Sequence, residues 1–379
     1  MQERIFFIGG VFTEKTLLEN LAVSPATNRW LKGLFSAIED KRIRIKTFAH
    51  LPEPLWPKGI LLPGKINCLD SNYDSNLIRY VNLPFLRSRS LSYLYLFNFI
   101  KSLKRSTKPF AILSYYPSFY ASIVGNYAQN KYKIPWIDIC PDVFDPGPNG
   151  HPYPRGASNA KGHVFLSYKA YKNSLFQNNL HLDGGIESLK FSKKNRIKRG
   201  KIILYTGMLD KWGGIKILLK AFKKIKDPSV RLWVCGHGES KDLNLALKKD
   251  SRITYYGLVP EKKLEQLCND TTVFVNPRPN SVLGNDMNFP SKVLEYLSYG
   301  KPVISTWTPG LSPDYKSVLD IIEKDSAEHL SHKILSILSW PETKFQKKSV
   351  KIKQFMQEKK TWDYQASRLI DWIKTNIVF

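Results

Sequence analysis

Cysteine is scarce in this chain of 379 residues, which contains four of them, at positions 68, 140, 235 and 268. They stand too far apart for a Cys-x-x-Cys pair or a Cys/His zinc spacing, which excludes a disulfide-stapled scaffold and a zinc module. No apolar run reaches the roughly 18 residues of a membrane-spanning helix, and the first residues lack the apolar core of a secretory signal. The sequence therefore predicts a cytoplasmic protein without a transmembrane segment.

Motifs of several common enzyme classes are absent as well. The chain has no phosphate-binding G-x-x-x-x-G-K-[ST] loop, no G-x-S-x-G nucleophile elbow and no H-E-x-x-H zinc motif. Gly236-His237-Gly238 begins like a dinucleotide fingerprint, but Lys241 takes the place of its third glycine. An Asp-x-Asp pair, which could hold a divalent ion on a diphosphate, is also missing, and Pro141 interrupts the spacing of Asp138 and Asp142. We expect neither a bound metal nor a cofactor.

Acidic residues are few relative to basic ones. There are 32 Asp and Glu against 58 Lys and Arg, which gives a formal net charge of +26. Both halves of the chain share this excess. Such a surface attracts polyanions, namely nucleic acid, anionic lipid head groups or phosphorylated substrates, and charge alone does not choose among them.

What the chain does contain is a regular alternation of short apolar runs and amphipathic helical patterns. The runs that predict strands are Arg4–Ile8, Ile43–Phe48, Ala111–Ser114, Trp136–Ile139, Lys201–Thr206, Val230–Cys235, Ile253–Tyr256, Thr272–Asn276 and Pro302–Ser305. Helical patterns lie between most of them, as in parallel sheets with helical crossovers. We predict an α/β fold of two doubly wound, Rossmann-like domains, at residues 1–182 and 183–361, with a last helix at 362–379.

The densest group of chemically useful residues lies between 276 and 304. Pro290 suits the first position of a helix, and the free N–H groups of such a first turn attract anions. Ser291 and Lys292 add a hydroxyl and a positive charge there. Glu295 is four residues after Ser291, so the two share a helix face, and a carboxylate can accept hydrogen bonds from two ribose hydroxyls. The segment therefore predicts a site for a nucleoside diphosphate.

Together with four other segments, this stretch resembles the donor-binding half of GT-B glycosyltransferases. The other segments are Tyr205–Leu209, Gly213–Phe222, Leu232–Gly238 and Tyr256–Pro260. The pattern is similar to the large retaining family four, with its capsule and exopolysaccharide members, and it covers roughly residues 200–310. The resemblance implies a GT-B fold with two domains facing a cleft and the last helix packed back on the first domain.

By this resemblance the protein is a glycosyltransferase. It would move a sugar from a nucleotide-diphosphate sugar such as a UDP-sugar to a hydroxyl of a glycan, with retention and without metal. The implied donor-binding residues are Gly207, Lys211, Gly214, Gly236, Leu258, Arg278, Ser291, Lys292 and Glu295. Arg278 and Lys292 would also be catalytic, because a departing diphosphate needs its charge neutralised.

The chain departs from the family pattern at three positions. The first of the family's two glutamates, which touches the donor sugar, falls on Met287, and the diphosphate-binding Arg and Lys of the first loop fall on Met208 and Gly213. Lys211 and Arg278 are the candidates for the missing positive charge.

The first half carries weaker signals for an acceptor site. Gly9 and Gly10 follow the first strand, where a ligand could approach the backbone, and Asn28 precedes a helix. Asp142 follows the strand that contains Asp138, and it could bind the acceptor or act as a base if the reaction inverts. The segment 84–108 mixes aromatic and basic residues, which fits either a membrane interface or a core helix.

The resemblance and the charge together imply the partners. We expect a nucleotide sugar, a glycan or lipid-linked glycan acceptor in polysaccharide biosynthesis, and the anionic inner face of the cytoplasmic membrane as a peripheral docking surface. Two other readings stay open: a GT-B nucleotide-sugar epimerase, and a non-enzymatic nucleic-acid binder, although the aromatic–basic signatures of common RNA-binding modules are missing, so we expect no nucleic acid.

Overall fold

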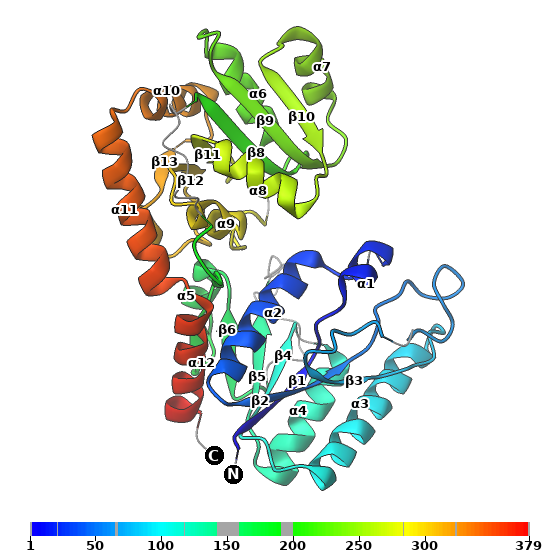
Figure 1. The fold of residues 1–379 in the computed structure, drawn as a ribbon. Helices are drawn as coiled ribbons and strands as arrows, with labels where there is room; N and C mark the ends of the chain where they lie inside the picture. Colours follow the sequence, from blue (N-terminus) through cyan, green and yellow to red (C-terminus); the bar gives the residue numbers. More distant parts are fainter. Residues whose placement is uncertain are drawn as a thin grey trace. The chain divides into compact units, whose positions relative to one another are not determined.

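The computed structural model describes residues 2–20, 22–64, 67–116, 118–141, 159–190, 200–282, 284–322 and 324–377. Its contacts divide the chain into two units. Unit 1 comprises residues 1–166, 170–185 and 362–379, and unit 2 comprises residues 167–169 and 186–361. The chain therefore leaves unit 1 to build unit 2 and returns to unit 1 for its final helix (Figure 1).

Unit 1 is built on a seven-stranded sheet with the strand order β3-β2-β1-β4-β5-β6-β7, and all the pairs recorded between these strands are parallel. The strands are β1 (Arg4–Ile8), β2 (Arg44–Ala49), β3 (Asp74–Leu77), β4 (Ala111–Tyr115), β5 (Trp136–Cys140), β6 (Gly162–Phe165) and β7 (Asn179–His181). The helices are α1 (Glu14–Glu19), α2 (Pro25–Asp40), α3 (Leu86–Arg105), α4 (Phe119–Tyr132), α5 (Tyr168–Asn173) and α12 (Trp362–Asn376). The order reverses direction between β1 and β4.

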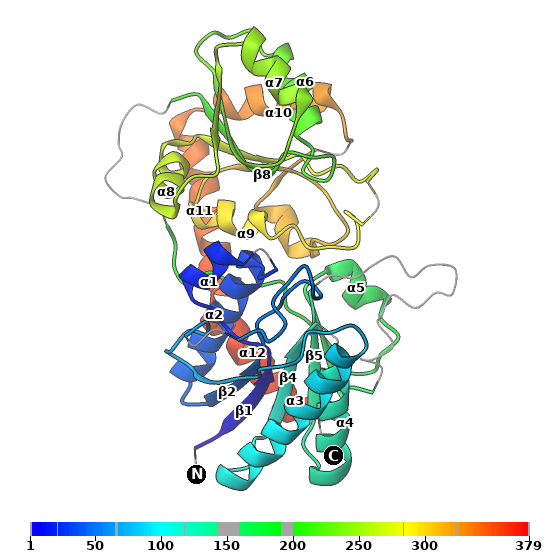
Figure 2. The ribbon, with the colours of Figure 1, turned by 90° about the vertical axis from the view of Figure 1, so that its right-hand side faces the viewer.

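The helices of unit 1 cover both faces of its sheet (Figure 2). On one face, α3 and α4 bury Tyr95, Phe99 and Val124 against Phe6 and Ile112 of the strands. On the other, α2 and α12 lie side by side, because small residues let a tryptophan approach. A Cβ on Gly33 or on Gly185 would collide with the ring of Trp362.

Unit 2 has a six-stranded sheet with the order β10-β9-β8-β11-β12-β13, again with parallel pairs. Its strands are β8 (Ile202–Met208), β9 (Arg231–His237), β10 (Ile253–Gly257), β11 (Val273–Asn276), β12 (Val303–Thr306) and β13 (Asp320–Ile322). Its helices are α6 (Ile215–Lys224), α7 (Lys241–Lys249), α8 (Glu261–Asp270), α9 (Lys292–Ser298), α10 (Ala327–Leu338) and α11 (Glu342–Lys359), with a 3₁₀ turn at Pro313–Ser317. The order reverses between β8 and β11, which is where ligands bind in such sheets.

Local sequence explains where the helices begin. Ser24, Ser118, Ser240 and Ser326 each accept a hydrogen bond from a backbone N–H in the first turn of the helix that follows, which satisfies a donor that the helix itself leaves unpaired. The strands β8 and β11 are almost continuously apolar and buried, as expected for parallel strands covered on both faces.

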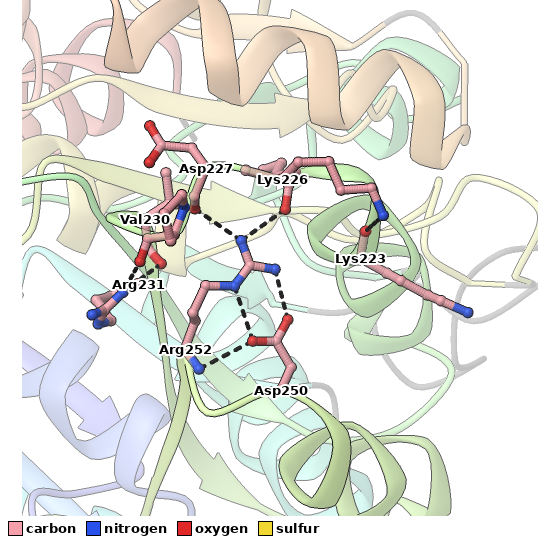
Figure 3. Close-up of polar contacts among 9 residues, drawn as sticks. Lys223, Lys226, Asp227, Val230, Arg231, Asp250 and Arg252 are labelled. Atoms are coloured by element: carbon pink, nitrogen blue, oxygen red, sulfur yellow. Dashed lines mark hydrogen bonds and ion pairs between the residues drawn. The ribbon is translucent and has the colours of Figure 1, made fainter.

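An arginine joins the turn before β10 to the turn after α6 (Figure 3). The Arg252 guanidinium donates to both carboxylate oxygens of Asp250 at 2.9 and 2.7 Å. Its Nη1 donates to the backbone oxygens of Ile225 at 2.7 Å and Asp227 at 2.9 Å, and its Cζ lies 4.7 Å from the centroid of the Phe222 ring. The side chain therefore satisfies two backbone acceptors and a carboxylate at once.

We expect Arg252→Met to lower the free energy of unfolding by about 2–3 kcal/mol, because it leaves a half-buried carboxylate and two carbonyl groups without their donor. Urea unfolding of the full chain measures this loss. The matched control is Arg231→Met, since Arg231 is exposed on the neighbouring strand and its guanidinium donates to the backbone oxygens of Pro228 and Val230. Equal losses in both variants would contradict a special role for Arg252.

Candidate functional site

The predicted donor residues of unit 2 gather around the carboxyl ends of β8 and β11. Gly207, near the end of β8, has a φ of +143°, and a Cβ there would overlap the Lys292 ammonium. Gly236 on β9 has a φ of +136°, and a Cβ there would collide with the Gly207 backbone. Only glycine fits at these two positions, because other groups approach the backbone closely. Gly236 allows the ends of β8 and β9 to come together, and Gly207 allows the Lys292 ammonium to lie on the backbone.

Hydrogen bonds between side chains and its own backbone hold the loop after β8 in its conformation. The Tyr205 hydroxyl donates to the Met208 oxygen at 2.6 Å, and the Gly213 N–H donates to the Asp210 carboxylate at 2.9 Å. Gly214 has a φ of +77°, packs against the Pro277 backbone and precedes α6. Lys211 is exposed, with its ammonium 4.6 Å from the centroid of the Trp212 ring. The loop thus presents an unburied cation beside an aromatic ring.

A buried asparagine joins this loop to the one after β11. Asn285 is fully buried, and its Oδ1 accepts a hydrogen bond of 2.6 Å from Arg278 Nε. Its Nδ2 donates to the backbone oxygens of Trp212 at 3.1 Å and Pro279 at 2.8 Å. Asn285 therefore fixes the direction of the Arg278 guanidinium and the distance between the two loops. Asn285 was not among the predicted site residues, because an asparagine inside a loop gives no pattern from which such a role could be found.

Helix α9 is anchored to β8 by a tyrosine. The Tyr296 hydroxyl accepts from the Thr206 N–H at 2.9 Å and lies 3.2 Å from the Thr206 carbonyl oxygen, to which it donates. Its ring stacks on Phe274 with centroids 4.6 Å apart. The helix begins at Lys292, two residues after the expected start, with Ser291 as its N-cap.

The first turn of α9 differs from the prediction of free N–H groups. The N–H groups of Val293 and Leu294 donate to the oxygens of Pro290 at 2.9 Å and Ser291 at 3.2 Å, so the turn satisfies two of its own donors in a 3₁₀ manner. Positive charge for a bound anion therefore comes mainly from side chains here.

Lys292 is the most perturbed cation of this group. Burial, followed by the positive charge of Arg278, lowers the pKa of Lys292 to about 8, although Glu295 and Asp210 act in the opposite direction. Its ammonium also lies 5.7 Å from the centroid of the Tyr205 ring. A lysine held beside a second cation in a partly closed site is prepared to receive a negatively charged ligand. Because Glu295 perturbs its pKa, the acidic group lies within electrostatic reach of the ammonium.

Leu258, expected near the base of a nucleotide, is 76% exposed and follows Gly257, which ends β10. An apolar side chain this exposed in the loop after a strand is available to a flat ring. The structure thus brings Gly207, Gly236, Arg278 and Lys292 together around β8 and β11, with Ser291 as the N-cap of α9 and Glu295 in its first turn.

In unit 1 the predicted acceptor residues have structural partners. The Gly9 N–H donates to the Phe48 oxygen at 2.8 Å, and a Cβ on Gly10 would lie 2.7 Å from that of Ala49. Asn28 was expected before a helix but lies within the first turn of α2, because Ser24 caps the helix four residues earlier. It is buried, and its amide both accepts from and donates to the Phe12 backbone, at 2.7 and 3.0 Å. These residues shape the turn after β1. Their role in acceptor binding stays a prediction, and Asp142 lies outside the described residues.

A cavity of about 760 Å³ lies elsewhere in unit 2, between α6 and α10. Ile217, four lysines and residues 325–328, at and just before the start of α10, line it. None of the predicted site residues is among them.

Comparisons with known proteins agree with this geometry. The model of the family Glycosyl transferases group 1 matches residues 200–339, which contain every predicted donor residue. No curated protein matches the chain. A glycosyltransferase from Rickettsia africae has a similar structure, with a TM-score of 0.70, 13% sequence identity and 98% of each chain covered.

Two further structures are similar over the same length. Sucrose-phosphate synthase from Thermosynechococcus elongatus has a TM-score of 0.66 and 14% identity, with 98% of each chain covered. Anabaena HepE, solved in complex with UDP and glucose, has a TM-score of 0.64 and 14% identity, with 98% of this chain and 99% of that chain covered. At such identities the likeness establishes the fold, and it confirms the prediction of two Rossmann-like units in the GT-B class.

Proposed function

We propose that this glycosyltransferase binds a nucleotide-diphosphate sugar in unit 2, at the ends of β8 and β11. The premise is the match of residues 200–339 to the family Glycosyl transferases group 1. The observation that carries this proposal is the Lys292 ammonium, which lies on the Gly207 backbone with its pKa lowered to about 8. Anabaena HepE, which was solved with UDP and glucose, supports a UDP-sugar as the donor.

In the proposed reaction the chain's cations stabilise the leaving group. The bond between the anomeric carbon and the diphosphate oxygen breaks, and an acceptor hydroxyl oxygen bonds to that carbon with retention. A phosphate oxygen of the departing diphosphate takes the hydroxyl proton, so no dedicated base is needed. Lys292 and Arg278 balance the charge that develops on the diphosphate, and Lys211 is the further cation of the loop after β8. Glu295 accepts hydrogen bonds from the ribose.

The acceptor that we propose is a lipid-linked glycan in polysaccharide biosynthesis, taken at the cytoplasmic face of the membrane. The net charge of +26 supports a peripheral position on anionic lipid. Among the described residues, none of the helices combines the length and the apolar character needed to cross a bilayer. We also propose that the reaction needs no metal ion. The thermal-unfolding experiment described next tests this point, because it is run with and without magnesium.

The experiment is a thermal-unfolding panel with UDP, GDP, dTDP, CMP and ADP, each with and without magnesium. A nucleotide at 100 times its Kd should stabilise the protein by about 2.7 kcal/mol. We expect one diphosphate to raise the melting temperature equally with and without magnesium, and Glu295→Ala to weaken its binding. Glu265→Ala, on exposed α8, is the matched control.

Three outcomes would count against the proposal. Absence of any shift would remove the donor site, and a shift that needs magnesium would overturn metal independence. Conversion of the matching nucleotide sugar without an acceptor would favour an epimerase instead.

A further inference from the structure

We propose that unit 1 docks on an anionic lipid surface through one apolar patch, formed by the loop after β2 and the start of α3. We call it the docking patch and define it by Leu55, Trp56, Ile60, Leu62, Phe85 and Leu86. Each of these side chains is at least 45% exposed, and Phe85 is 92% exposed. The inference deepens the proposed function, because it rests on the peripheral membrane position proposed above and names the surface responsible.

The two segments of the patch are bonded into one surface by Asn82, which is fully buried. Its Nδ2 donates to the oxygens of Pro54 at 2.7 Å and Ile60 at 2.9 Å. The backbone N–H of Asn82 donates to the backbone oxygen of Leu61 at 2.8 Å, and the backbone carbonyl of Asn82 accepts from the Trp56 N–H at 3.2 Å. The apolar side chains are therefore presented by a braced loop. Figure 1 shows this loop projecting beside the first turn of α3.

The backbone at Phe85 supports the same conclusion. Phe85 is the N-cap of α3 and has a φ of +65°, in the left-handed region that a bulky residue rarely adopts. In the isolated molecule Phe85 therefore carries two free-energy costs: the strain of the left-handed backbone conformation and the exposure of its aromatic ring to water. Such outliers persist where a surrounding structure maintains them for a purpose.

The charge around the patch selects lipid as the occupant. Helix α3 begins with Arg87 and Arg89 next to the patch and has no acidic residue among its 20, while its other basic residues, Lys101, Lys104 and Arg105, lie at its far end. Arg87 also braces the patch, since its Nη1 donates to the backbone carbonyl oxygen of Glu53 at 3.0 Å. Apolar and aromatic side chains beside Lys and Arg fit the boundary between acyl chains and anionic head groups. A second copy of this basic surface would be repelled by it.

The exposed face of α3 continues the patch. Tyr93 and Phe97 are 68% and 51% exposed, and their rings stack with centroids 6.3 Å apart. Tyr95 and Phe99 point the other way and are buried in the core. The helix therefore has two aromatic faces. One is buried in the core, as the core-helix alternative predicted, and the other is the face that we propose for the lipid interface.

The test is co-sedimentation of the full chain with vesicles of phosphatidylcholine, with and without phosphatidylglycerol. We expect binding that requires phosphatidylglycerol and weakens with salt, and a fall of about tenfold or more in the partition coefficient for the double variant Trp56→Ser, Phe85→Ser. The matched control is Leu175→Ser, which removes an 85% exposed leucine of unit 1 outside the patch. Thermal unfolding and the nucleotide shift of each variant show that the fold and the donor site are intact.

The outcomes separate this proposal from the donor-site proposal. Equal vesicle binding by the wild-type chain and the double variant would overturn the docking patch, and so would wild-type binding that ignores phosphatidylglycerol. Patch-dependent self-association without vesicles would replace lipid by a second copy. If the wild-type chain shows the nucleotide shift but does not bind the vesicles, the docking patch is wrong and the donor site stands. If the wild-type chain binds the vesicles through the patch but shows no nucleotide shift, the donor site alone is rejected.

Discussion

Replacing Lys292 with Met should weaken the binding of the nucleoside diphosphate by about 10- to 100-fold and lower kcat/KM by about 10²- to 10³-fold. The side chain is the cation that lies against the backbone at the end of β8, and Arg278 provides the second charge. Binding is measured with the nucleotide that the thermal panel selects, and activity with its sugar. Lys262→Met, on the exposed side of α8, is the control.

The same lysine predicts a pH dependence. Its pKa is lowered to about 8 in the free protein, and a bound diphosphate would raise it again, so binding above pH 8 requires the uptake of a proton. Phosphate groups complete their ionisation near pH 6 and do not contribute above pH 8. Affinity should therefore fall by up to about tenfold per pH unit above pH 8. The Lys292→Met variant should lose this slope, and a slope that persists in the variant would assign the titration to another group.

Replacing Asp138 with Asn should change how stability depends on pH. Asp138 is fully buried on β5, and its carboxyl accepts from the Ser114 hydroxyl at 2.5 Å and the Cys140 thiol at 3.3 Å. The Trp136 indole N–H donates to the same hydroxyl at 2.8 Å. Burial raises the pKa of Asp138 to about 7, against the two hydrogen bonds, which lower it.

The sign of the effect follows from which state binds the proton. Between about pH 4 and pH 7 the native carboxyl keeps a proton that the unfolded chain has released, so stability falls as pH rises through this range. The total loss is about 4 kcal/mol for a shift of roughly three pKa units, and it is complete above pH 7. Asp138→Asn removes the titration, so the variant should gain about that amount relative to the wild type between pH 4 and pH 8.

Urea unfolding of both proteins at pH 5 and pH 8 measures this difference. Asp371→Asn, on the exposed side of α12, is the control and should follow the wild type at both pH values. If the Asp138 variant and the wild type respond identically to pH, the native carboxyl ionises at an ordinary pKa and the prediction is wrong.

The sequence predicted the strands β8 to β12 of unit 2 because each of them contains a short apolar run. Ile202–Met208 and Val273–Asn276 both lie where short apolar runs were expected. Short, half-exposed strands such as Asp74–Leu77 gave no such signal and were missed. The strand β13 and the helices α1, α4, α5, α10 and α11 were not predicted either.

The sequence allowed the charged residues and the glycines of the candidate site to be predicted. It did not allow prediction of the buried residues that hold them in position. Lys292 and Gly207 were selected from motifs, and the structure explains why the two are needed together, since the ammonium occupies the space that a Cβ would fill. Asn285 and Tyr296 act through contacts between segments far apart in sequence, namely Asn285 with Trp212 and Tyr296 with Thr206. Single-sequence patterns do not encode such pairings.

The return of the chain to unit 1 bears on biogenesis. Helix α12 leaves the ribosome after every other described segment of both units, yet it covers α2, where Trp362 packs on Gly33 and Trp30. All segments of unit 2 are synthesised before α12, whereas unit 1 keeps an apolar face uncovered until α12 has been made. A nascent chain stalled before residue 362 would therefore present that face to chaperones and proteases, and expression of residues 1–185 alone would yield a fragment that lacks one wall of its core.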